Sequence, residues 1–249
     1  MLVDELEHGL EPHRIIRLLG SLGAKEKEPP LQVFATTHAP TVLRELAGEQ
    51  LVVLREKGDN HDALSLSSHG DIQGTIRSQP EAFLAPSVIV CEGANEVGFI
   101  RGLDQFRVAN NKPSIAACVV ALVDAGGVSK IYSRALPLLK ADYRVSILRD
   151  DDKQPDGVEE TTFEKQGGAI FKWRDGMSIE GELFACVSEK AVTEMLSYAI
   201  ELHGSDLVNE HISSVSMNST SLEDLQTAAM LDGYETAHRS ILARASGTK

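Results

Sequence analysis

"SVIVCEGANE", residues 87–96, combines several structural signals in one short segment. An apolar run rich in β-branched residues ends at Glu92, and a glycine then leads into a helical pattern. Apolar segments recur at 114–123, 144–150 and 169–173, with helical patterns between them. This alternation of strands and helices predicts an α/β fold, a parallel sheet flanked by helices.

The flanking sequence extends this fold at both ends. We expect a first α/β segment over residues 1–72, and a connecting helix over 73–86 that is stopped by Pro86. The sheet domain then covers 87–178. The remaining residues, 179–249, read as a small helical extension.

The composition is that of an ordinary globular protein, with 42% hydrophobic residues. The longest apolar run, residues 116–123, is far shorter than the roughly 20 residues of a membrane span, and no signal peptide opens the sequence. We therefore expect a cytoplasmic protein. Cys91, Cys118 and Cys186 lack a CxxC pairing, and their apolar surroundings predict reduced core residues.

The formal net charge of −13 argues against a general attraction to nucleic acid. The charge is unevenly distributed, because residues 87–190 hold 13 Lys and Arg against 16 Asp and Glu, whereas 191–249 hold three against eight. If a polyanion binds, it binds the middle of the chain. Divalent metal would also neutralise several of the central acids.

Carboxylates stand at the predicted end of each central strand. Glu92 ends the first strand, Asp124 the second, and Asp150 and Asp152 the third. Ligands of open α/β sheets gather at these carboxyl ends. Alternation along an extended chain sends Asp150 and Asp152 to one side, so we expect Asp151 on the other side, in solvent.

Further candidates surround these acids. Glu180 and Glu182 open a helix just after the last strand, and oxygen ligands without His or Cys favour Mg²⁺ or Mn²⁺ over zinc.

A resemblance follows from these residues. VIVCEGANE, the GG turn at 126–127 and LRDDD at 148–152 together resemble the Toprim signature, a glutamate after the first strand and a DxD after a later one. Asp124 departs from this pattern, in which glycine is common, and is either a ligand or a cap of the helix at 128. Toprim domains occur in topoisomerases, primases, recombination mediators and nucleases of the OLD (overcoming lysogenization defect) family.

The upstream residues select among these. MLVDELEHGLEPH, residues 1–13, resembles the Walker B strand and catalytic glutamate of an ABC-type ATPase, with Asp4 and Glu5. FATTHAP, residues 34–40, resembles its switch histidine, His38. The end of an ATPase domain leading into a Toprim domain resembles the OLD family over nearly the whole chain, and SIEGELF resembles that family's later glutamate.

The resemblance implies a DNA endonuclease that cleaves phosphodiester bonds with two Mg²⁺ or Mn²⁺ ions. Residues 179–249 would then complete the active site of the 87–178 domain. The implied ligands of the first ion are Glu92, Asp150 and Asp152, and those of the second are Glu180 and Glu182. Glu96 either joins the first set or is only a solvated charge at a helix N-terminus. The implied cation that neutralises the transition state is Lys172 or Lys190, and the sequence does not choose between them.

The ATPase positions are expected to be silent in this chain. ATP binding needs a GxxxxGK[ST] loop, and the 249 residues contain none, so ATP would act only in a full-length context. The exposed half-sheet of an incomplete ATPase domain would favour self-association, and we expect a homodimer. DNA is the expected partner. The family also suggests a helicase-type or other defence partner.

Two rival functions remain open. A topoisomerase needs a tyrosine nucleophile, but Tyr132 and Tyr143 lie inside the Toprim pattern, and Tyr198 and Tyr234 read as packing residues of helices. A primase usually brings a zinc module, which three scattered cysteines do not make. The other rival is a non-catalytic Toprim module that binds DNA or acts as a scaffold.

Overall fold

The computed structural model describes residues 1–66 and 72–248, and the chain forms two compact units. The first unit comprises Met1–Arg149 and Gln154–Phe171, and the second comprises Asp150–Lys153 and Lys172–Lys249. Each unit is described by itself. The boundary expected at residue 72 adjoins residues 67–71, which lie outside the described residues.

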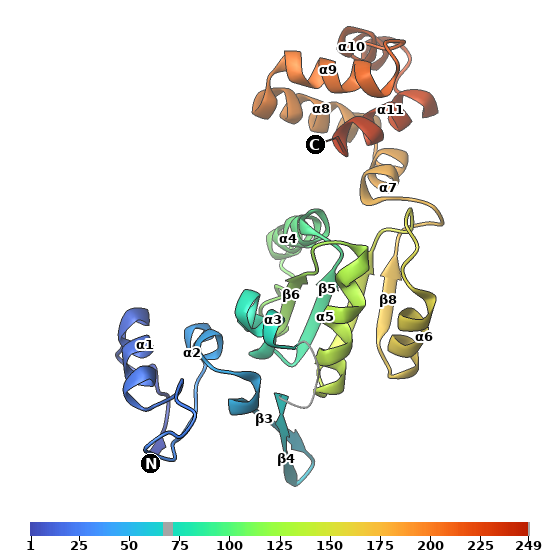
Figure 1. The fold of residues 1–249 in the computed structure, drawn as a ribbon. Helices are drawn as coiled ribbons and strands as arrows, with labels where there is room; N and C mark the ends of the chain where they lie inside the picture. Colours follow the sequence, from blue (N-terminus) through green and yellow to red (C-terminus); the bar gives the residue numbers. More distant parts are fainter. Residues whose placement is uncertain (67–71, 249) are drawn as a thin grey trace. The chain divides into compact units, whose positions relative to one another are not determined.

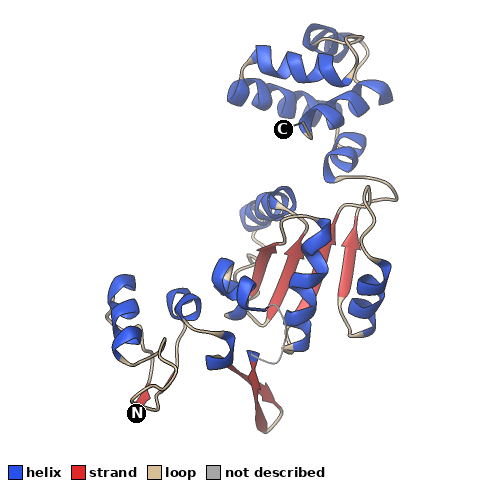
Figure 2. Cartoon of the chain, viewed as in Figure 1, coloured by secondary structure: helices blue, strands red, loops and turns tan. Residues whose placement is uncertain are grey.

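A four-stranded parallel sheet forms the centre of the first unit, with strand order β6-β5-β7-β8 (Figures 1 and 2). Its strands are β5 (Ser87–Cys91), β6 (Val120–Asp124), β7 (Arg144–Arg149) and β8 (Ala169–Lys172). In the register, Cys91 lies opposite Asp124 on one side and Leu148 on the other. The predicted α/β fold with a parallel sheet flanked by helices is confirmed.

Helices connect consecutive strands, and right-handed crossovers place the first of them on one face and the other two on the opposite face. These helices are α4 (Ala94–Ala109), α5 (Val128–Lys140) and α6 (Gly157–Lys165). Val88, Val90 and Ile147 of the strands pack with Ile131 and Phe163 of the helices in one core cluster. The core therefore lies between the sheet and helices α5 and α6, which cover one face of the sheet.

Strand β6 begins later than the sequence predicts. Residues 115–119 form a turn, in which Val119 adopts a left-handed φ of 54° and its amide bonds to the carbonyl of Ala116 at 2.9 Å. Extended pairing is incompatible with this conformation, so the strand starts only at Val120. The prediction of a strand from residue 114 is wrong because apolar content alone does not reveal the turn.

The segment before the sheet contributes to the same core. In place of one helix over 73–86, the structure has α3 (Ile72–Ser78) and the 3₁₀ helix η3 (Pro80–Phe83). Ile72, Ile76 and Phe83 are buried in the core cluster that contains the strands. An antiparallel hairpin, β3 (Val52–Lys57) and β4 (Asn60–Ser65), precedes them, as the sequence predicts.

The N-terminal region has a small core of its own. Strands β1 (Leu2–Val3) and β2 (Phe34–Ala35) pair in parallel, and helices α1 (Pro12–Ser21) and α2 (Pro40–Glu45) follow them along the chain. Both helices begin with proline, whose fixed φ suits the first turn. A cluster of buried residues joins these elements: Leu6, Ile15, Leu19 and Val42.

A fully buried arginine closes the carboxyl end of β7. Arg149 is 0% exposed, and its Nη2 lies 3.0 Å from Oε2 of Glu160 on α6. The hydroxyl of Tyr132 on α5 donates to the same carboxylate oxygen at 2.7 Å. A buried charge is stable only with such partners, so this network ties α5 and α6 to the strand end.

The second unit is a helical bundle, composed of α7 (Ile179–Cys186), α8 (Glu189–His203), α9 (Ser205–Val215), α10 (Leu222–Leu231) and α11 (Thr236–Ser246). Its core includes Phe184, Val192, Leu196, Ile212 and Leu225. Serines cap three of the helices, as Ser221 does with Asp224 in the predicted capping box of α10. Residues 179–249 are thus helical, as predicted.

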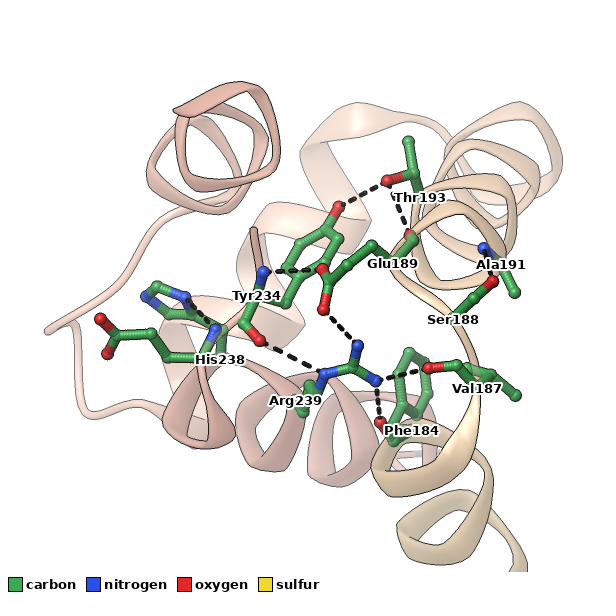
Figure 3. Close-up of polar contacts among 10 residues, drawn as sticks. Phe184, Val187, Ser188, Glu189, Ala191, Thr193, Tyr234, His238 and Arg239 are labelled. Atoms are coloured by element: carbon green, nitrogen blue, oxygen red, sulfur yellow. Dashed lines mark hydrogen bonds and ion pairs between the residues drawn. The ribbon is translucent and has the colours of Figure 1, made fainter. Parts of the chain in front are cut away.

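Arg239 of α11 joins three helices of this bundle (Figure 3). Its Nη1 donates to the carbonyl of Phe184 at 2.6 Å and to the carbonyl of Val187 at 2.9 Å. These two carbonyls lie at the C-terminal end of α7, where the helix offers them no amide partner. Its Nη2 forms an ion pair with Glu189 at the start of α8. The Glu189 carboxylate also accepts from the Tyr234 amide at 2.7 Å.

Replacing Arg239 with methionine is expected to destabilise the bundle by about 2–3 kcal/mol, because the carbonyls of α7 lose buried donors. Hydrogen exchange of the full chain measures this as faster exchange in α7, α8 and α11. Arg244→Met, on the exposed side of the same helix, is the matched control and should leave exchange unchanged. Equal exchange in both variants would contradict this role of Arg239.

Lowering the pH is expected to weaken the contact between Glu189 and Arg239. The Tyr234 amide and the Arg239 guanidinium hold the pKa of Glu189 below its ordinary value. The pKa of Glu189 is lower in the folded chain than in the unfolded chain, where it is about 4.3, so the ionised carboxylate stabilises the fold above that pH. This stabilisation is lost as the pH falls through the lower pKa of the folded chain. In Glu189→Gln, the protection of α8 against exchange, corrected for the intrinsic pH dependence of amide exchange, should no longer fall over that acidic range. An unchanged pH profile would remove Glu189 from the effect.

Several residues differ from their predicted surroundings. Cys91 is buried, but Cys118 and Cys186 are exposed, so the prediction of three core cysteines is wrong for two of them. Tyr198 is 61% exposed and is no packing residue, whereas Tyr234 is buried in the bundle core. Among the described residues, no helix combines the length and apolar character that crossing a membrane requires.

Candidate functional site at the strand ends

Glu92 follows β5 directly and is fixed by its own backbone. Its amide donates to the carbonyl of Leu148 on β7 at 2.9 Å, and its carbonyl accepts from Gly127 at 2.8 Å. Gly127 has a φ of 118°, which residues with a side chain rarely adopt, so the GG turn depends on glycine here. Glu92 therefore sits among the ends of β5, β6 and β7, and its side chain is half-buried.

Glu96 is a buried cap of α4. Its side chain is 3% exposed, and Oε2 accepts from the Gly93 amide at 2.7 Å. This interaction satisfies a donor at the helix start and places negative charge at the positive end of the helix dipole. The alternative of a solvated charge is wrong for Glu96, because the carboxylate lies inside the protein.

Asp124 ends β6 and shapes the next turn. Its Oδ1 accepts from the Gly126 amide at 2.8 Å, while its backbone is held by the carboxamide of Gln79, which donates to the carbonyl and accepts from the amide, both at 2.7 Å. Burial, with Glu96 and Asp124 nearby, raises the pKa of the Cys91 thiol to about 12. The strand ends of the first unit thus carry a negative field.

The acidic run after β7 is engaged by its own unit. Asp150 is half-buried and accepts from the Ile179 amide at the start of α7, at 2.9 Å. Asp151 is 5% exposed and accepts from the Gly176 amide at 2.9 Å and from Lys172 Nζ at 3.0 Å. The prediction that Asp151 is solvated is wrong, because this carboxylate anchors the loop before α7.

The remaining predicted residues of the second unit differ in surroundings. Asp152 is exposed, and Glu180 is half-buried in the first turn of α7. Glu182 forms an ion pair with Arg174 at 2.8 Å, and hydrogen bonds from Arg174 hold its pKa below the ordinary value.

The two candidate lysines are now distinguishable by their contacts. Lys172 Nζ forms an ion pair with the buried carboxylate of Asp151, the residue that follows Asp150 in the sequence. Lys190 lies on the exposed surface of α8, 3.7 Å from Glu194 one turn later, which is a weak surface pair. Lys172 is therefore the lysine held near the acidic run.

The side chains that the structure describes do not lie in the geometry of a metal site. Within residues 1–66 and 72–248, no group of three or more His, Cys, Asp or Glu side chains is arranged to hold a metal ion. The candidate ligands of the second unit instead accept hydrogen bonds from its amides and cations, as Asp150, Asp151 and Glu182 show. A bound ion would replace some of these donors.

The ATPase-type positions come together at the β1–β2 pair. The Thr36 hydroxyl donates to Asp4 and accepts from the Glu5 amide at 2.8 Å. Glu5 has a left-handed φ of 44°, so the chain turns sharply directly after Asp4. His38 is exposed, and its amide donates to Glu7 at 2.6 Å.

Sequence reasoning missed Glu7, which holds this region together. Its carboxylate also accepts from the Thr37 hydroxyl at 2.7 Å. Burial raises the pKa of Glu7, but the hydrogen bonds from Thr37 and His38 outweigh it and keep the pKa below its ordinary value. The available signal was the TTH segment after the strand, residues 36–38, because its hydroxyl and amide donors need an acceptor such as a carboxylate.

Comparison with known families agrees with this N-terminal arrangement. A family model described as "AAA domain, putative AbiEii toxin, Type IV TA system" matches residues 1–44. The first 44 residues are thus an ATPase-like region, in which β1, β2 and both early helices lie. No curated protein matches the chain.

Proposed function

We propose that the chain is a Mg²⁺- or Mn²⁺-dependent DNA endonuclease of the Toprim type, related to the OLD family. One observation carries the proposal: carboxylates follow directly on the ends of neighbouring parallel strands. Glu92 follows β5, Asp124 ends β6, and Asp150 is the next residue after β7. Strand ends of such a sheet are where ligands of open α/β folds bind.

The chemistry of these residues supports divalent ions. Carboxylate oxygens are the ligands that Mg²⁺ and Mn²⁺ prefer. Glu96 and Asp124 add to the effect of burial, which is the main cause of the raised pKa of the Cys91 thiol. Two ions would lower the pKa of an attacking water and stabilise the leaving oxygen of a phosphodiester. The proposed ligands are Glu92, Asp150, Asp152 and Glu180, with Glu96, Asp124 and Glu182 as further members.

Lys172 is the cation that we propose next to this chemistry. Its ion pair with Asp151 places a positive charge beside the acidic run, where it would offset the charge of a bound phosphate.

A second candidate is a non-catalytic Toprim module that binds DNA. It is favoured by the hydrogen bonds that Asp150 and Asp151 already accept from the loop and the helix after them. Carboxylates used in this way stabilise the fold without any metal.

Incubation with supercoiled plasmid distinguishes the two. The endonuclease converts the plasmid to nicked or linear forms with Mg²⁺ or Mn²⁺ and not with EDTA, whereas the binding module retards it without cleavage. A covalent protein–DNA adduct would instead indicate a topoisomerase.

We also propose a homodimer. Leu2 and Phe34 lie opposite each other on β1 and β2 and are 83% and 61% exposed, and an apolar sheet face of this kind favours association. The molar mass in solution tests this, and a monomer at working concentration would contradict it.

A further inference from the structure

A cavity of about 270 Å³ opens beside the edge strand of the sheet in the first unit. It is lined by the first two turns of α4, by Leu122 and Asp124 of β6, and by Gln79. The cavity lies against the edge strand β6 and the start of α4, and not at the switch point between β5 and β7 where open sheets of this strand order usually bind ligands.

One wall of the cavity is fixed by the edge strand itself. The carboxamide of Gln79 forms hydrogen bonds with both backbone groups of Asp124, so it belongs to the wall of the cavity. The charged side chains that line the cavity are then Arg101 of α4 and Asp124. Val97 and Leu122 supply apolar surface between them.

The combination of Arg101, Asp124 and apolar side chains indicates which kind of ligand the cavity would bind. Arg101 attracts a phosphate. An anion alone would be repelled by Asp124, and a cation alone by Arg101. A nucleotide satisfies both, because its phosphate pairs with arginine, its base packs on apolar side chains, and its amino or imino groups donate to a carboxylate.

We infer that this cavity holds one nucleotide of a DNA strand, with the phosphate at Arg101 and the base between Val97, Leu122 and Asp124. The inference rests on the proposed endonuclease function, and it names where a nucleotide of the substrate is held. Arg101 is the residue that anchors the strand, and the cavity is a subsite at the edge of the sheet.

Two glycines of α4 offer a matched test. A Cβ built on Gly98, which lines the cavity, or on Gly102, one turn later and outside the lining, meets nothing within 4 Å. Gly98→Leu therefore fills the cavity without a backbone clash, and Gly102→Leu adds the same group elsewhere. Both changes raise helix propensity, so neither should unfold α4.

Fluorescence anisotropy with a short labelled single-stranded oligodeoxynucleotide in Ca²⁺ measures binding. Gly98→Leu is expected to weaken it about tenfold or more, and Arg101→Ala roughly 10-fold to 100-fold, the loss of a charged hydrogen bond. Gly102→Leu should bind like the unmodified chain. Equal affinity of all four proteins, or no binding by any, overturns the inference.

Competition identifies what the cavity recognises. Deoxynucleoside monophosphates should displace the oligonucleotide from the unmodified chain, and inorganic phosphate at the same concentration should not. If phosphate competes equally well, the base is not held and the inference fails.

Failure of the inference and of the proposed function are distinguishable. Cavity-dependent binding without cleavage of plasmid in Mg²⁺ or Mn²⁺ removes the endonuclease and retains the nucleotide site. Cleavage that Gly98→Leu leaves unchanged retains the endonuclease and removes the site.

Discussion

Replacing Glu92 with alanine is expected to abolish metal-dependent cleavage of plasmid DNA, with a loss in rate of at least about a hundredfold. The reason is that loss of a group that merely orients a metal ligand already costs roughly 10–100-fold, and loss of a ligand costs more. Asp150→Ala should have an effect of the same size. The measurement is the initial rate of nicking of supercoiled plasmid in Mn²⁺.

The matched control is Glu164→Ala, which removes an exposed carboxylate from α6 and should retain full activity. The unfolding transition of Glu92→Ala, measured beside that of the unmodified chain, separates lost catalysis from lost stability, and the backbone bonds of Glu92 to Leu148 and Gly127 remain in this variant. Cleavage that survives both Glu92→Ala and Asp150→Ala would remove these residues from the mechanism.

The largest effect on stability is expected from Glu160. Glu160→Ala should lower the free energy of unfolding of the first unit by about 3 kcal/mol, because it removes the ion partner of a fully buried arginine. Tyr132 loses its acceptor in the same variant. Urea denaturation monitored by hydrogen exchange of β7 and α5 measures the change.

Apolar replacement of both partners provides the control for this prediction. The double variant Arg149→Met with Glu160→Leu removes both charges of this pair and should recover much of the lost stability, since buried ion pairs contribute little beyond apolar packing. Exposed Glu164→Ala should have no effect. If Glu160→Ala is as stable as the unmodified chain, the buried pair is not what holds the strand end.

The fold was largely predictable because its signals are local. Alternating apolar strands and amphipathic helices between residues 87 and 172 indicate a parallel sheet, and the structure contains it. The start of β6 was not predictable in this way, because a left-handed Val119 has no signature in hydrophobic pattern. The exposure of Cys118, in that same turn, follows from the same cause.

The strand-end positions of single candidate residues were predictable, but their contacts were not. Sequence spacing placed Glu92 and Asp124 at strand ends, where they are found. Period-two alternation failed for Asp151, because the chain leaves the strand at Arg149 and the next residues bend to meet the loop at Gly176. Partners far along the chain, such as Gln79 for Asp124, leave no local trace in the sequence.

The bonds between Gln79 and the backbone of Asp124 also bear on how the molecule avoids polymerising. Strand β6 is the outermost strand of its sheet, and an unpaired outer strand is a template on which other chains can stack as fibrils. The side-chain amide of Gln79 fills the donor and acceptor positions that an incoming backbone would use at this residue. At this residue Gln79 therefore blocks the backbone pairing by which another strand would add to the sheet.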